Sequence, residues 1–291
     1  TISATDDPQR LAPRRSLSSS PPLPGTPPGS LAALVGTFLL AACAQVPRQG
    51  DTSASSGTMA YALGGPAKTP VVVLQSGLGD GRKTWNTVWP QLTASHRVFA
   101  LDRPGYGDSP STTAPRDPCQ VAGELHAALR DAKVPPPYLL VGHSLGGLYQ
   151  VVFARLYPDE TAGVLLLDPT HPEHWATLQR DTPKTAALLR STVFTSTMRA
   201  EFDAQAQCLD GLPPWPSGLP ARLLFSGRFG PLETDEFQRT LMRLRLDWQQ
   251  RLGASAETVP TSGHDLHRDA PERVVQALER LLDAAAKPPR R

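Results

Sequence analysis

A Gly-x-Ser-x-Gly pentapeptide is the segment of this 291-residue chain with the clearest potential for chemistry. It reads GHSLG over 142–146 and directly follows the apolar run YLLV at 138–141. A serine on a sharp turn between a strand and a helix must adopt a strained backbone, and glycines two residues to either side leave room for that turn. The pattern predicts that Ser144 is a nucleophile for acyl transfer. The alternative is a serine in a glycine-rich turn without chemistry.

Such a serine needs a rigid scaffold, and the rest of the chain alternates short apolar runs with stretches of helical periodicity, such as 121–132 and 148–156. Short apolar runs that end in Gly, Pro or Asp are typical of buried strands. The predicted strands lie at 71–75, 97–101, 138–141, 163–167, 222–226 and 257–259, and a closing helix at 271–286. Because continuous apolar strands that alternate with helices form parallel sheets covered on both faces, we predict a doubly wound, mostly parallel α/β sheet.

Three motifs in the chain resemble those of the α/β-hydrolase superfamily, of the small bacterial serine-esterase type. They are GHSLGG at 142–147, DRPGYGDS at 102–109 and SGH at 262–264. The resemblance covers about residues 66–286 and implies an α/β-hydrolase domain, which we place at 66–287. It also implies a helical cap after the sixth strand in the family's count, which is the strand at 163–167 in this chain. The stretch of about 170–220, where the alternation stops, suits a cap over the carboxyl ends of the strands.

The histidines supply the candidate base. The family orders its catalytic residues as serine, acid and histidine. His264 stands in a glycine-containing loop just before the closing helix, where the family carries its base, and His267 is expected to be structural. If the resemblance fails, His264 is a surface histidine. His171 and His174 flank Glu173, but two histidines without a third spaced ligand are a weak signal, so we predict no metal and no cofactor.

Two regions of the sequence could supply the acid that orients the histidine. Asp168 ends the strand at 163–167 on the catalytic edge, and a carboxylate there would hold the imidazole in the correct tautomer. We favour Asp168 as the acid. The alternative is that its carboxylate only accepts hydrogen bonds from the backbone of the following turn. Most relatives instead carry the acid after the strand at 222–226, where this chain has no carboxylate until Glu233 and Asp235. Either of these two residues is the alternative acid.

Acyl transfer also needs two backbone N–H donors directed at the developing oxyanion. Leu145 follows the nucleophile and supplies one donor. The resemblance implies Leu78 as the other donor, in the turn QSGLG at 75–79. Ser76 stands where the family often has histidine, which changes the support of this loop but not its backbone donor. The resemblance marks Asp102, in the family's turn motif, as structural.

The amino-terminal region carries a separate signal. The run LAALVGTFLLAA at 31–42 is too short to span a bilayer, which takes about 20 apolar residues. With Arg14 and Arg15 upstream, it has the length and flank of a signal-peptide core. The run fits the signal of a lipoprotein, as the residues after it indicate, and the alternatives are an ordinary cleaved signal peptide or a short buried helix.

The residues LAAC at 40–43 resemble the lipobox of bacterial lipoproteins, in which the cysteine is lipidated. We therefore predict a disordered lead with a lipoprotein signal at 1–42, lipidation at Cys43 and a flexible tether at 43–65. The protein would then be exported to the bacterial cell envelope and bound to a membrane. Ala44, in place of the aspartate associated with inner-membrane retention, favours the outer membrane facing the periplasm.

The amino-acid composition indicates a globular protein, and the charge distribution argues against a nucleic-acid-binding one. The chain is 40% hydrophobic and 19% charged, as in globular proteins. Its net charge is +2, with the basic excess before Gly50, so the remainder is neutral and we predict no nucleic-acid partner. Cys119 and Cys208 remain once Cys43 is assigned. In an exported protein they form either a disulfide or two buried thiols.

Together these features predict a serine hydrolase that cleaves a small-molecule carboxylic ester through an acyl-enzyme. The same residues would serve a thioesterase, a C–C hydrolase or an acyltransferase, because fold and triad do not fix the substrate. A non-catalytic ligand-binding homologue is the alternative from another class. A serine nucleophile excludes the branches of the superfamily that use aspartate, the dehalogenases and epoxide hydrolases.

Overall fold

The computed structural model of the chain describes residues 45–230 and 234–286. The predicted signal segment at 1–42, Cys43 and the alternative acid Glu233 lie outside the described residues. No helix in the described ranges is long and apolar enough to cross a membrane.

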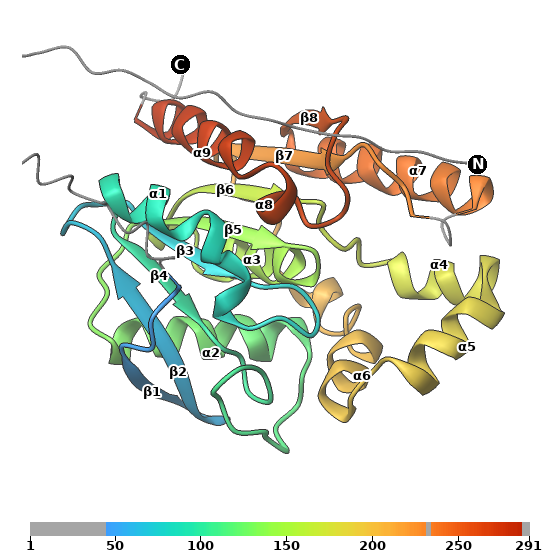
Figure 1. Cartoon of the computed structure of the whole chain (residues 1–291), viewed down its shortest axis with the longest axis horizontal. Helices are drawn as coiled ribbons and strands as arrows, with labels where there is room; N and C mark the ends of the chain where they lie inside the picture. Colours follow the sequence, from blue (N-terminus) through green and yellow to red (C-terminus); the bar gives the residue numbers. More distant parts are fainter. Residues whose placement is uncertain (1–44, 231–233, 287–291) are drawn as a thin grey trace, which may run out of the picture. The chain divides into compact units, whose positions relative to one another are not determined.

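Within the described residues, eight strands form one sheet in the order β1-β2-β4-β3-β5-β6-β7-β8 (Figure 1). The first two pairings, β1 with β2 and β2 with β4, are antiparallel, and all others are parallel. The strands are β1 (Gly50–Ala54), β2 (Gly57–Gly64), β3 (Val71–Gln75), β4 (Val98–Leu101), β5 (Tyr138–His143), β6 (Thr161–Leu167), β7 (Ala221–Ser226) and β8 (Ser255–Val259). The predicted α/β-hydrolase fold class is confirmed.

Helices cover both faces of this sheet. The α-helices of the described residues are α1 (Trp89–Ser95), α2 (Pro118–Asp131), α3 (Leu145–Leu156), α4 (His174–Asp181), α5 (Pro183–Thr192), α6 (Ser196–Asp203), α7 (Asp235–Leu252), α8 (Leu266–Asp269) and α9 (Pro271–Ala285). The eighteen-residue helix α7 was not predicted from the sequence.

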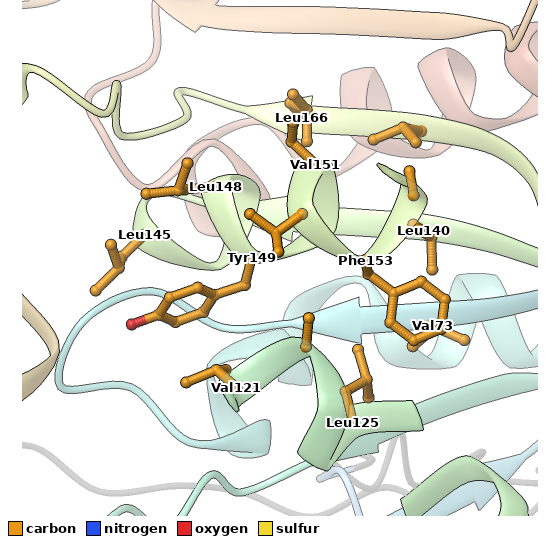
Figure 2. Close-up of a cluster of buried hydrophobic side chains, with 14 of the residues drawn as sticks. Val73, Val121, Leu125, Leu140, Leu145, Leu148, Tyr149, Val151, Phe153 and Leu166 are labelled. Carbon is orange, nitrogen blue, oxygen red and sulfur yellow. The ribbon is translucent and has the colours of Figure 1, made fainter. Parts of the chain in front are cut away.

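Strand β3 shows why its apolar run has no alternation. Val71 and Val73 join the core formed with α2 and α3, while Val72 and Leu74 join a second core on the opposite face, with α1 and α9. Successive side chains of a strand point to opposite faces, so a strand covered on both sides needs apolar residues at every position. Figure 2 shows the first of these cores, where side chains of α3 pack between α2 and the sheet.

The predicted tether at 43–65 is wrong over most of its length, because β1 and β2 form a hairpin there. Residues Met59 and Ala62 of β2 are fully buried, and Tyr61 stacks on Phe99 of β4 with ring centroids 5.5 Å apart. The side chains that face inward are mostly small, so the segment has the composition of a linker. Its order comes from strand pairing with β4, which composition does not reveal.

The cap lies between β6 and β7, as expected, and consists of α4, α5 and α6. It has its own aromatic core, in which the ring of Phe202 lies 4.8 Å from Trp175 and 5.2 Å from Phe194 between centroids. In Figure 1 the three helices project from the carboxyl end of the sheet.

A disulfide joins Cys119, at the start of α2, to Cys208, which follows the cap helices. The bridge links the returning end of the cap to the body of the domain. The two cysteines are 89 residues apart in the sequence, so the bond closes a long loop in the unfolded chain.

Replacing both Cys119 and Cys208 with serine should lower the free energy of unfolding by about 3–4 kcal/mol, because the unfolded chain regains the entropy that this loop removes. Urea unfolding of the variant and of the oxidised parent measures the difference. The parent in reductant is the matched control and should unfold like the variant. Equal stability of the oxidised and reduced parent would contradict the bridge.

Candidate active site

Ser144 occupies the sharp turn between β5 and α3 in a strained conformation, with φ 52° and ψ −124°. The flanking positions must be glycine because a side chain there would clash with the neighbouring backbone. A Cβ on Gly142 would lie 2.5 Å from the carbonyl oxygen of Gly146, and a Cβ on Gly146 would lie 2.2 Å from that of Gln75. The half-buried Ser144 has its Oγ 3.4 Å from Oγ1 of Thr170. The turn therefore has the geometry expected of a nucleophilic serine.

The structure brings Asp168 and His264 together, 96 residues apart in the sequence. His264 Nδ1 donates a hydrogen bond of 2.8 Å to Asp168 Oδ2. Asp168 follows β6 and His264 follows β8, so both lie at the carboxyl edge of the sheet, where Ser144 follows β5. The carboxylate is 8% exposed and the imidazole 55% exposed. The carboxylate is therefore enclosed, while the imidazole is open to solvent.

Two further residues fix Asp168. Ser226, at the end of β7, donates from Oγ to Asp168 Oδ2 at 2.8 Å, and Arg245 of α7 donates from Nη2 to Oδ1 at 2.7 Å. Burial raises the pKa of Asp168, but the hydrogen bond and charge of His264, with the charge of Arg245, outweigh burial and hold this pKa well below its usual value. Asp168 is therefore ionised at neutral pH, as the partner of a general base must be.

The alternative acids do not form this pair. Asp235 is the exposed first residue of α7, and Glu233 lies outside the described residues. At the end of β7, where relatives commonly carry the acid, this chain has Ser226, which donates to Asp168 instead of replacing it.

The loop after β3 lies against the nucleophile, because a Cβ on Gly77 would be 3.2 Å from Cβ of Ser144. Leu78 follows in this loop, and Leu145 is the first residue of α3. Ser76 supports the loop from within: its hydroxyl donates to the carbonyl of Gly81 at 3.1 Å and accepts from Nε1 of Trp85 at 3.0 Å. This serine thus fills the supporting position that the family often gives to histidine.

His143, which precedes the nucleophile, supports the base loop. Its Nε2 donates to the carbonyl oxygen of His264 at 3.0 Å, and its ring centroid lies 4.6 Å from that of His267. Burial, followed by the neighbouring His264 and His267, lowers the pKa of His143 far below its usual value, so this imidazole is neutral. His143, Asp265 and His267 place three potential metal-ligand atoms within 4.8 Å of one another. Of these three side chains, His143 makes the hydrogen bond to His264.

His171 and His174 have different surroundings in the structure. His171 Nε2 lies 2.6 Å from Asp247 of α7. His174 is half-buried, with its ring centroid 6.3 Å from that of Phe202 and 6.0 Å from that of Phe237, and burial, followed by the nearby His264, lowers its pKa to about 4. His267, expected to be structural, is fully buried with its Nε2 2.8 Å from Oγ1 of Thr84. Asp102 is also buried and accepts the backbone N–H of Asp108 at 2.9 Å.

Sequence reasoning missed Arg245. It lies on the buried face of α7 with Leu244, Trp248 and Leu252. An arginine within the apolar stripe of an amphipathic helix is a detectable signal, because a buried charge needs a partner. That partner is the catalytic-edge carboxylate Asp168.

A strained serine between strand and helix, and a bonded histidine and aspartate on the same edge of a mostly parallel sheet, define the α/β hydrolases. The chain belongs to the alpha/beta hydrolase family, whose profile matches residues 71–277.

Two relatives match part of the chain. The chain is 34% identical over 98 residues to the uncharacterized protein YqjL of Bacillus subtilis, covering 34% of this chain and 39% of that protein. It is 32% identical over 105 residues to the (lyso)-N-acylphosphatidylethanolamine lipase of Mus musculus, covering 35% of this chain and 30% of the lipase. The matched segments thus span well under half the length of these relatives.

Two solved enzymes share the fold. A thermophilic esterase from Thermogutta terrifontis superimposes with a TM-score of 0.57 at 20% identity, covering 83% of this chain and 100% of that one. Naproxen esterase from Bacillus subtilis superimposes with a TM-score of 0.56 at 17% identity, covering 82% and 93% of the two chains. At these identities the likeness shows the fold alone, and the fold with the family defines a hydrolase.

Proposed function

We propose that this protein is a serine hydrolase that cleaves carboxylic esters, with Ser144 as nucleophile, His264 as base and Asp168 as acid. The observation that carries the proposal is the 2.8 Å bond from His264 to a buried, ionised Asp168, on the sheet edge that also holds the strained Ser144. Support for an ester as the substrate comes from the similar proteins named as esterases and a lipase.

In the proposed reaction, Ser144 Oγ attacks the ester carbonyl carbon while its proton passes to Nε2 of His264. Asp168 stabilises the resulting imidazolium. The carbonyl oxygen becomes an oxyanion, which accepts hydrogen bonds from the backbone N–H groups of Leu78 and Leu145. Collapse of this intermediate breaks the bond to the alcohol oxygen, which takes the proton from His264. A water, activated by His264, then attacks the acyl-enzyme and releases the carboxylic acid.

A fluorophosphonate probe and a series of 4-nitrophenyl esters of increasing acyl length test this function. An activated serine forms a covalent adduct at Ser144, located by peptide mass, and the series gives the preferred acyl length. A protein that binds esters but leaves both reagents unreacted would be a non-catalytic homologue. Turnover of the matching thioester with no turnover of the oxygen ester would assign a thioesterase.

We also propose that Cys43 carries a lipid anchor, supported by the sequence LAAC at 40–43. Cys43→Ser should move the protein from the membrane to the soluble fraction, because each buried lipid methylene contributes about 0.8 kcal/mol and several chains bind firmly. Fractionation of the bacterial envelope with intact mass of both forms is the measurement. Recovery of both forms as soluble protein, with no lipid mass on the parent, would rule the anchor out.

A further inference from the structure

A buried ionic cluster connects the cap to the loop that carries Leu78, and the proposed reaction does not use it. Glu201 of cap helix α6 is fully buried and accepts from Arg103, in the turn after β4, through Nε at 2.9 Å and Nη2 at 2.9 Å. Tyr106 adds a hydrogen bond of 3.0 Å to the same carboxylate. The cluster continues through Arg116 to Glu124 of α2. Two arginines and two glutamates balance the charge.

The other edge of the Arg103 guanidinium holds the loop. Nη1 donates to the carbonyl oxygen of Ser76 at 2.6 Å, and Nη2 donates to that of Gly77 at 2.9 Å. One planar group therefore binds a carboxylate of the cap and two consecutive carbonyls of the loop, a geometry that a lysine ammonium cannot reproduce.

The contact with Gly77 sets the direction of a proposed oxyanion donor. The carbonyl of Gly77 and the N–H of Leu78 belong to one peptide group, which is planar and trans, so they point in opposite directions. While Arg103 holds this carbonyl, the N–H of Leu78 is fixed on the other side. Rotation of this peptide would replace the donor by a carbonyl oxygen.

The same cap helix packs directly on both loops. A Cβ on Gly79 would lie 3.2 Å from Cε of Met198, and one on Gly105 would lie 2.5 Å from Oγ1 of Thr197. Both glycines have positive φ, 81° and 85°. The cap end of the cluster is therefore held against the loops by close packing as well as by charge.

We propose that Glu201 is a positioning residue that acts through Arg103 to hold the Leu78 N–H in the oxyanion hole, so that docking of the cap and formation of the hole are coupled. This inference rests on the proposed function of Ser144.

Glu201→Gln in the full chain is the test. The amide cannot satisfy Arg103 as an ion, so the guanidinium and the two carbonyls it holds become mobile. We expect kcat on a short 4-nitrophenyl ester to fall about 10- to 100-fold, in the range of a weakened oxyanion donor, with KM changed less than about twofold. Assays run well below the unfolding temperature of each variant. Wild-type kcat in the folded variant would overturn the proposal.

Glu124→Gln is the matched control. Glu124 pairs with Arg116 in the same cluster, at 2.7 and 2.8 Å, and is the other buried carboxylate. Its loss should lower the unfolding temperature as the Glu201 variant does, while kcat remains at the wild-type value. An equal fall of kcat in both variants would show that the cluster acts only through stability, against the proposal.

If the Glu201→Gln variant does not fold, Glu201→Asp is the second test of the proposal. It keeps the charge but shortens the side chain by one methylene, and we expect an intermediate fall in kcat; wild-type kcat in this variant would also overturn the proposal. The activity of the parent protein distinguishes failure of this proposal from failure of the proposed function. A parent without esterase turnover or Ser144 labelling refutes both, whereas an active parent with fully active Glu201 variants refutes the positioning role alone.

Discussion

Ser144→Ala is expected to reduce ester hydrolysis by about 10⁴- to 10⁶-fold, the loss typical of a triad nucleophile. The fold should persist, because the strain at φ 52° belongs to the turn and alanine adds no atoms to it. The backbone of the turn is held by bonds from the N–H of Ser144 to Leu167 and from the N–H of Thr170 to Ser144, and both remain in the variant.

Initial rates on the best ester of the acyl series, with fluorophosphonate labelling and thermal unfolding, measure this effect. Ser217→Ala, at an exposed serine in the loop before β7, is the control and should keep full activity. Turnover near the parent's in a folded Ser144→Ala protein would end the serine-hydrolase interpretation.

Asp168→Asn should lower kcat by about 10⁴-fold, because the amide can favour the wrong tautomer of His264 and cannot stabilise its protonated form. It also leaves Arg245, 5% exposed, without its counter-ion. Breaking a buried pair costs about 3–5 kcal/mol, so the variant should be less stable as well.

Two comparisons separate catalysis from stability in this experiment. Asp168→Asn combined with Arg245→Met removes the orphaned charge and should recover stability but not turnover. Asp235→Asn and Glu233→Gln, at the alternative acids, should stay active. If one of them loses activity while Asp168→Asn keeps it, the acid is misassigned.

The centre of the parallel sheet was predictable because its inner strands are apolar on both faces. β3 and β6 are therefore visible as runs in the sequence. The hairpin of β1 and β2 was not, since its inward side chains are small and its order comes from pairing with β4. Helix α7 was also missed. Such elements are specified by partners distant in the sequence rather than by local composition.

The candidate site divides in the same way. Ser144 and His264 stand in local motifs, whose glycines are required by the turn itself. The sequence favoured Asp168 over Asp235 because Asp168 ends the strand at 163–167. Its contacts with Ser226 and Arg245, on two elements that come later in the chain, could not be predicted. The sequence pattern could rank the candidates for the acid, but the hydrogen bond between Asp168 and His264 depends on how the ends of β6 and β8 lie in the folded sheet.

The buried pair of Glu201 and Arg103 limits how new substrate preferences can be engineered into this scaffold. Because ligands of open α/β sheets bind at the carboxyl ends of the strands, from which the cap projects, grafting a cap from a relative is a direct route to a changed specificity. A graft without an acid in register with Arg103 would leave a guanidinium with 2% exposure and no counter-ion beneath the active-site loop. A cap should therefore be grafted together with the residue at position 103 of the same relative.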